Sequence, residues 1–174
     1  MSEASVVVVV GNPQAGSRTA AAAGVVGERL AVLLGETDLE PTVTVIDLAD
    51  VARALVGWGD PVVAGLKRTV SGATALVVAS PTYKASFTGL LKLFLDQFGS
   101  DELAGLPTVA VMSGGSAAHT LALDTQLRPV LVEIGASLPT RGVYFAGPEI
   151  DEPAAVVDRW WVVAAPILRR VRWS

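Results

Sequence analysis

Three segments of the chain combine small, flexible residues with hydrogen-bonding side chains that could hold a ligand. The first, residues 11–19, reads Gly-Asn-Pro-Gln-Ala-Gly-Ser-Arg-Thr and precedes a stretch of helical periodicity. The N-terminus of a helix carries unpaired N–H groups and a partial positive charge, so it can bind phosphate without a metal. Ser17 and Thr19 add hydroxyl donors, and Arg18 adds a charged one. The alternative interpretation, with equal weight, is that Ser17 only caps the helix and Arg18 is a solvated surface charge.

This first segment matches neither of two common nucleotide-binding motifs. It lacks the Gly-Lys-Ser/Thr of a Walker loop, which disfavours triphosphate hydrolysis. It also lacks the Gly-x-Gly-x-x-Gly run of dinucleotide-binding folds. A phosphate group here would therefore be held by a loop of another kind.

The other two segments could contact a planar ring. Residues 81–89 place Tyr83 among small polar groups ahead of a strong helix, so this backbone could lie along a heterocycle while Tyr83 closes the pocket. Tyr83 could equally pack in a subunit contact. Residues 113–116, Ser-Gly-Gly-Ser, precede another helix. Fixed amide donors there would stabilise the negative charge that a flavin gains on reduction, although a glycine turn capped by Ser116 is the simpler alternative.

Composition excludes several classes of protein. The chain has 174 residues, 51% of them apolar and 17% charged, which predicts a single domain over 1–174 with a sizeable core. A net charge of −4 argues against a nucleic-acid partner. Without cysteine there is no disulfide, thiol catalysis or thiolate metal site, and the single histidine, His119, rules out a zinc site of several imidazoles. His119 is expected to be structural rather than an acid or base.

The N-terminus and the hydropathy profile predict a cytoplasmic protein without a membrane partner. The first residues include Glu3 and lack the positive n-region of a signal peptide. The chain also contains no apolar run near the 18–20 residues needed to cross a bilayer.

Apolar strands alternate with amphipathic helices along the chain, which must position the three segments. Strands are predicted over 6–10, 43–46, 73–79, 108–112 and 137–145, and helices over 22–34, 61–72, 87–98, 123–134 and 153–171. This order predicts an α/β fold: a flavodoxin-like three-layer sandwich around a five-stranded parallel sheet of order 2-1-3-4-5. Ligands of such folds lie beyond the carboxyl ends of strands one and three, where the three segments should meet.

Four stretches carry a family resemblance, and one of them is the loop over 11–19, which resembles a Gly-Ser-x-Arg start followed by Ser-Arg-Ser. Residues 80–92 (Ser-Pro-Thr-Tyr-Lys-Ala-Ser-Phe-Thr-Gly-Leu-Leu-Lys), 114–119 (Gly-Gly-Ser-Ala-Ala-His) and 127–131 (Leu-Arg-Pro-Val-Leu) resemble the NAD(P)H-dependent FMN reductases. They are most similar to the branch that supplies reduced flavin to sulfonate-degrading monooxygenases. The resemblance runs from about residue 6 to residue 145, and the 80–92 stretch is its most specific part.

The resemblance implies an activity and a set of binding residues. Hydride would pass from NADH or NADPH to FMN without a catalytic side chain, and reduced FMN would go to a partner flavin-dependent monooxygenase. It also implies a homodimer or homotetramer, with the helix after Tyr83 in the interface. The phosphate-binding residues would be Ser17, Arg18 and Thr19, and the cofactor-binding set as a whole is Asn12, Gln14, Ser17, Arg18, Thr19, Pro81, Thr82, Tyr83, Lys84, Ser113, Gly114 and Gly115.

The chain departs from the family pattern at two places. Asn12 and Gln14 stand where the family usually has Ser and Arg, which removes a cation; this would weaken FMN binding by about 1.5–3 kcal/mol unless Arg18 compensates. Thr125 stands where flavin-releasing relatives tend to carry an aromatic residue in a widened helical turn. Pro129 lacks the N–H that the Thr125 carbonyl would accept, which predicts a kink. Release or retention of FMN is left open.

Three other functions fit the same scaffold. One is an FMN-bound quinone or azo reductase, and another is a non-enzymatic, flavodoxin-like electron carrier. Such carriers are usually monomeric and far more acidic than −4. The third is a flavin-free binding or regulatory domain, against which the convergence of the three candidate ligand-binding segments argues. The sequence shows no clamp for a 2′-phosphate and so does not choose between NADH and NADPH.

Overall fold

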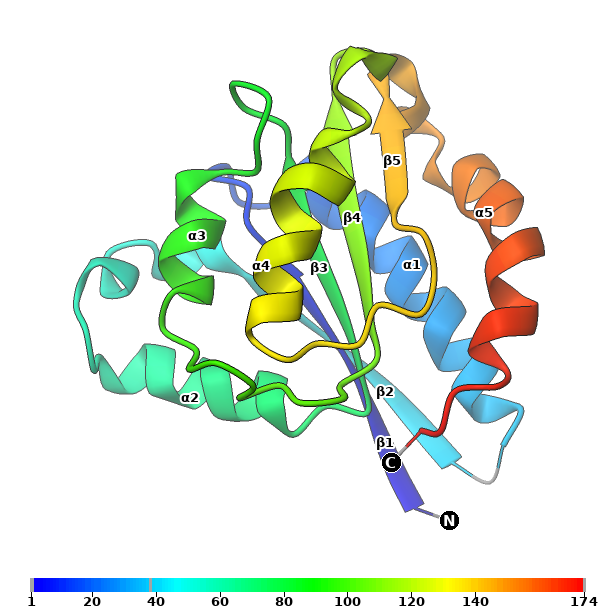
Figure 1. The fold of residues 1–174 in the computed structure, drawn as a ribbon, viewed down its shortest axis with the longest axis horizontal. Helices are drawn as coiled ribbons and strands as arrows, with labels where there is room; N and C mark the ends of the chain where they lie inside the picture. The colour runs from blue at the N-terminus through cyan, green and yellow to red at the C-terminus, as the bar shows by residue number, and fades with distance from the viewer. Residues whose placement is uncertain (1, 38, 174) are drawn as a thin grey trace.

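The computed structural model describes residues 2–37 and 39–173, which form a parallel sheet covered by helices on both faces (Figure 1). The sheet has five strands in the order β2-β1-β3-β4-β5, as predicted. Helices α1 and α5 cover one face, and α2, α3 and α4 cover the other. The strands are β1 (Ser2–Val10), β2 (Leu39–Asp47), β3 (Ala75–Pro81), β4 (Thr108–Gly114) and β5 (Val143–Ala146). The helices are α1 (Arg18–Gly35), α2 (Pro61–Ser71), α3 (Gly89–Leu95), α4 (Arg128–Glu133) and α5 (Pro153–Leu168).

The run of valines in β1 is explained by burial on both sides. Val6, Val8 and Val10 pack in the core cluster under α1 and α5. Val7 and Val9 point to the opposite cluster, under α2, α3 and α4. A strand buried on both faces has no solvent side, so it reads as a continuous apolar run.

Side-chain caps begin α1 and α3, the helices that follow β1 and β3. Ser17 caps α1 by accepting from the Ala20 amide at 3.2 Å. Thr88 caps α3 in the same way by accepting from the Leu91 amide at 3.1 Å. Each cap satisfies an amide that has no partner inside its helix, and it fixes where the preceding loop ends.

Two predicted elements are shorter than the sequence pattern indicated. Helix α3 ends at Leu95, although Phe98 continues the apolar stripe and still packs edge-on against Phe94 with ring centroids 5.3 Å apart. Strand β5 begins at Val143, because the Arg128 guanidinium takes the carbonyls of Leu138 and Thr140 at 2.8 and 3.1 Å. Those carbonyls are thus withdrawn from strand pairing.

The predicted helix over 123–134 is divided in two. A π-helical turn spans Leu123–Leu127, and α4 follows it. The Arg128 amide donates to the Leu123 carbonyl, one residue further back than in an α-helix. Pro129 then offers no N–H to the Thr125 carbonyl, so the widened turn lies where the sequence predicted a break. Over residues 2–37 and 39–173, no helix is both long and apolar enough to span a bilayer.

Candidate functional site

A cleft of about 400 Å³ lies beyond the carboxyl ends of β1, β3 and β4. This is the point at which the winding of the sheet reverses, and the volume is in the range of small-ligand sites. Its lining residues come from four loops: Asn12, Gln14, Gly16, Ser17, Arg18, Thr19, Pro81, Thr82, Tyr83, Ser113, Gly114, Gly115, Gly147 and Ile150. The structure thus brings together every predicted binding residue except Lys84.

Hydrogen bonds from Asn12 and from Asp47 fix the conformation of the loop between β1 and α1. The buried Asn12 side chain accepts from the Gln14 amide at 3.0 Å and donates to Thr19 Oγ1 at 3.1 Å. The Gly16 amide donates to Asp47 Oδ2, at the end of β2, at 3.0 Å. Gly16 itself has a φ of +61°, where a side chain would be strained. Asn12 therefore shapes the loop, and this loop delivers the chain to the start of α1.

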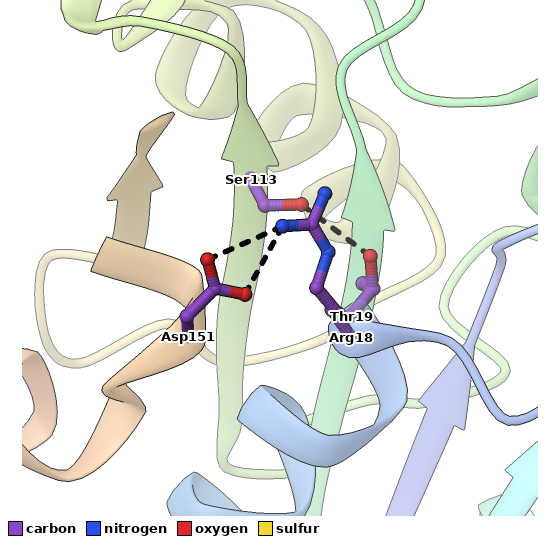
Figure 2. A network of polar contacts seen from close by, with 4 residues as sticks. All are labelled: Arg18, Thr19, Ser113 and Asp151. Atoms are coloured by element: carbon purple, nitrogen blue, oxygen red, sulfur yellow. Dashed lines mark hydrogen bonds and ion pairs between the residues drawn. The ribbon is translucent and has the colours of Figure 1, made fainter. Parts of the chain in front are cut away.

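The N-terminus of α1 offers donors to the cleft. As first-turn residues, Arg18 and Thr19 have backbone amides without an acceptor inside the helix. The Arg18 side chain is 70% exposed, and its Nη1 lies 3.0 Å from Asp151 Oδ1 (Figure 2). Amides, helix dipole and guanidinium together make this end of the cleft suited to an anion. We call it the phosphate end, defined by residues 12–19.

Thr19 and Ser113 link the phosphate end to β4. Thr19 is buried, and its Oγ1 lies 3.4 Å from Ser113 Oγ (Figure 2). Because the Asn12 amide nitrogen can only donate, the Thr19 oxygen is the acceptor in that contact. The Thr19 proton is then available to Ser113 or to a bound ligand.

The opposite end of the cleft, the ring end, is defined by residues 81–83 and 113–115. The Thr82 amide donates to the Ser113 carbonyl at 2.6 Å, which ties the loop after β3 to β4. Among the described residues, the buried Thr82 Oγ1 has no hydrogen-bond partner. A buried hydroxyl without a partner is costly, so it is expected to serve a bound ligand.

The two glycines of the ring end have different surroundings. A Cβ on Gly114 would lie 2.1 Å from the Tyr144 hydroxyl, which itself donates to the Ser116 carbonyl at 3.2 Å. A Cβ on Gly115 would meet nothing within 4 Å. Gly114 therefore allows Tyr144 to pack behind the loop, and Gly115 leaves its backbone accessible to a ligand.

Tyr83 and Lys84 separate at a tight turn. Tyr83 and Ser86 exchange backbone hydrogen bonds at 2.8 and 3.1 Å around Lys84 and Ala85, whose φ angles are +52° and +63°. Tyr83, 52% exposed, lines the cleft. Lys84 lies exposed at the turn and does not line the cleft, so its binding role remains a prediction.

Two residues of the lining, Gly147 and Ile150, were not predicted from the sequence. Gly147 and Ile150 follow β5, whose carboxyl end reaches the same edge of the sheet. A Cβ on Gly147, whose φ is +59°, would lie 3.2 Å from the Gly115 carbonyl. The Gly-Pro pair after the last strand was the available signal for this fourth loop.

Two residues outside the lining hold the loops together. Ser80 Oγ accepts from the Thr88 amide at 3.0 Å, and Thr88 Oγ1 donates to the Gly11 carbonyl. The Gly11 backbone in turn packs so closely on α3 that a Cβ there would lie 2.4 Å from Leu91 Cβ. The loop after β1 and the start of α3 are therefore joined.

Comparison with known proteins shows similarity over most of the chain. The family model described as NADPH-dependent FMN reductase matches residues 4–149. The NADH-dependent FMN reductase SfnF of Pseudomonas putida is 34% identical over 152 residues, which cover 84% of this chain and 80% of that protein.

Solved structures agree with this similarity. An oxidoreductase from Corynebacterium diphtheriae superposes with a TM-score of 0.83 at 29% identity, covering 98% of this chain and 97% of the other. The apo form of the NADH:FMN oxidoreductase EmoB superposes with a TM-score of 0.73 at 30% identity, covering 92% and 89%. With the matched model extending from β1 to the loop after β5, the chain belongs to the NADPH-dependent FMN reductase family.

Proposed function

We propose that this protein is an NAD(P)H-dependent FMN reductase, which transfers hydride from NADH or NADPH to FMN bound in the cleft. One observation carries the proposal: the same cleft has anion-binding donors at one end and a partnerless buried hydroxyl at the other. FMN has a phosphate and a polar ring edge separated by a ribityl chain, which matches this arrangement.

The residues present fit the two ends of FMN. At the phosphate end, the amides of Arg18 and Thr19 and the Arg18 guanidinium would bind the phosphate. At the ring end, Thr82 Oγ1 and the accessible Gly115 backbone would bind the polar edge of the ring. When bound, FMN supplies the two-electron acceptor of the reaction.

The protein's own groups would position the flavin ring and stabilise the charge that it gains on reduction. The Gly114 backbone is fixed by its pairing with Ala146 of β5, and the amide dipoles of Gly114 and of the following Gly115 would favour negative charge at the ring edge on reduction. Tyr83 lines the mouth of the cleft and would limit the access of water to the ring. No described side chain needs to exchange a proton with the nicotinamide, because hydride transfer is between the two cofactors.

Two finer features belong to the same proposal. Reduced FMN would be passed to a flavin-dependent monooxygenase, as the 80–92 resemblance implies. The protein would form a homodimer or homotetramer through the α3 side, where Leu93 and Tyr83 are 41% and 52% exposed. A chain without cysteine is compatible with the cytoplasm, where we place the activity.

The test is oxidation of NADH and of NADPH by the purified protein, followed at 340 nm, with and without added FMN. We expect turnover with at least one nucleotide and dependence on FMN. Absence of turnover with both nucleotides would contradict the proposal, and a bound flavin spectrum without turnover would favour an electron carrier.

A further inference from the structure

The phosphate end has a single charged residue, and that residue already has a partner. Of the described residues that line the cleft, only Arg18 carries a charge. Its Nη1 lies 3.0 Å from Asp151 Oδ1 and 3.4 Å from Oδ2 (Figure 2). The Arg18 charge is therefore compensated by a carboxylate before any phosphate arrives.

Asp151 is held near Arg18 by the fold. It ends the 3-10 helix Gly147–Asp151, which directly follows β5 and also carries the lining residues Gly147 and Ile150. Glu149 anchors this helix by accepting from the Ala146 amide at 2.9 Å and pairing with Arg159 at 2.7 Å. The Asp151 backbone is thus fixed beside the cleft, while its carboxylate is 55% exposed and able to turn away.

A second carboxylate lies at the same end. Asp47 accepts from the Gly16 amide at 3.0 Å, so one loop donor is occupied as well. The phosphate end thus presents one guanidinium and the free amides of α1 to the cleft, and two carboxylates that do not line the cleft contact its residues from outside. A phosphate monoester carries nearly two negative charges at neutral pH, so an adjacent carboxylate opposes its binding.

We propose that Asp151 sets the affinity for FMN by competing with its phosphate for Arg18. This inference rests on the proposed function. When FMN binds, its phosphate replaces the Asp151 carboxylate at the Arg18 guanidinium. The net contribution of Arg18 to the free energy of FMN binding is therefore smaller than that of an unpaired arginine. When FMN dissociates, the ion pair between Asp151 and Arg18 forms again. This exchange favours a flavin that is released as a product over one that is retained.

The test is the variant Asp151→Asn, with FMN and riboflavin affinities measured by flavin fluorescence. Riboflavin lacks only the phosphate, so it isolates the proposed effect. We expect FMN to bind about two- to fivefold more tightly, the range that one exposed ion pair is worth, and riboflavin to be unchanged. The matched control is Asp158→Asn, which breaks the Arg29 pair about 16 Å further along α1 and should leave both affinities unchanged.

A double variant shows whether Asp151 acts through Arg18. In an Arg18→Ala background, most of the effect of Asp151→Asn on FMN affinity should disappear. Thermal unfolding of the flavin-free proteins should show that all variants fold. If the Asp151→Asn variant binds FMN more weakly than the unaltered protein, the inference is overturned, since Asp151 would then orient Arg18 for the phosphate. Unchanged FMN affinity, or equal changes for both flavins, would also overturn it. Failure of the unaltered protein to bind FMN would instead contradict the proposed function.

Discussion

The ring end and the phosphate end of the cleft are built in different ways. Ring-end residues follow directly from paired strands: Pro81 pairs with Ser113, and Gly114 pairs with Ala146. Phosphate-end residues stand on a loop of mostly exposed residues and on the first turn of a helix, with an arginine that has an exposed partner.

The two ends therefore differ in what they would recognise: the shape of the ligand at the ring end and its charge at the phosphate end. Backbone atoms within a sheet cannot adjust without disturbing the core, so we expect the ring end to discriminate between ligands by their shape. Exposed charges exchange partners at little cost, so the phosphate end can be tuned by single substitutions. Changes at the ring end should therefore affect FMN and riboflavin alike, whereas changes at the phosphate end should affect FMN alone.

The largest effect is expected from Gly114→Ala. The new Cβ would lie 2.1 Å from the Tyr144 hydroxyl, so either Tyr144 or the loop must move. We expect binding of both flavins to weaken by about ten- to a hundredfold, measured by fluorescence titration.

Two further variants test the cause of that loss. Adding Tyr144→Phe removes the atom at 2.1 Å and leaves the ring carbon at 3.2 Å, so part of the affinity should return. Gly24→Ala, in α1 with nothing within 4 Å of the new Cβ, should leave binding unchanged. A loss confined to FMN would contradict the assignment of Gly114 to the ring end.

A smaller and more selective effect is expected from Arg18→Ala. Hydrogen bonds from a charged group are strong, but exposure and the Asp151 pair reduce the net contribution of Arg18. We expect FMN to bind about tenfold more weakly and riboflavin to be unaffected. Arg29→Ala, which removes another paired arginine of α1, is the control. Equal losses of affinity for FMN and riboflavin would show that Arg18 does not bind the phosphate.

Thr82→Val should move flavin affinity and stability in opposite directions. Its hydroxyl has no partner among the described residues, so its removal should stabilise the flavin-free protein by about 1 kcal/mol in urea unfolding. The same change should weaken both flavins by about threefold to tenfold if the hydroxyl serves the ring.

Thr140 provides a matched control for this prediction. Its Oγ1 is also buried without a partner in the described part of the chain, and it does not line the cleft. Thr140→Val should therefore raise stability and leave flavin binding unchanged. Equal behaviour of the two variants in flavin titrations would show that the Thr82 hydroxyl has no ligand role.

The smallest effect is expected from a similar ion pair outside the cleft. Two hydrogen bonds from Arg169 at 3.1 Å lower the pKa of the Glu36 carboxyl below its usual value. A lowered pKa in the folded state stabilises the protein above the ordinary glutamate pKa of about 4.3, and the contribution is lost as pH falls through the folded pKa. Glu36→Gln should slightly lower the Tm at neutral pH, the difference should disappear once pH falls below the folded-state pKa of Glu36, and flavin binding should not change. A pH-independent difference would contradict this origin.

The strand order was predictable because burial leaves a strong pattern in the sequence. The valines of β1 and the fully buried β3 read as strands, and parallel winding then brought three loops to one edge. The start of β5 was not predictable, since it depends on Arg128 reaching carbonyls ten and twelve residues away. Local periodicity carries no information on such a contact.

The site shows the same division. Eleven of the twelve predicted binding residues line the cleft, because they lie in the loops that follow β1, β3 and β4. Lys84 does not, since the turn at Lys84 and Ala85 directs it elsewhere. Asp151 was missed because it meets Arg18 across 133 positions of sequence, and no motif relates the two.

The hydroxyl of Thr88 has a mechanical consequence. It caps α3 and donates to the Gly11 carbonyl, so one side chain clamps a helix to the loop that begins the phosphate end. In the homo-oligomer that we propose, a subunit that contacts the outer surface of α3 would touch the same helix that holds Gly11 in place. Subunit association at α3 and flavin binding at the start of α1 would then share two contacts, the Thr88 hydrogen bond and the packing of Gly11 against Leu91.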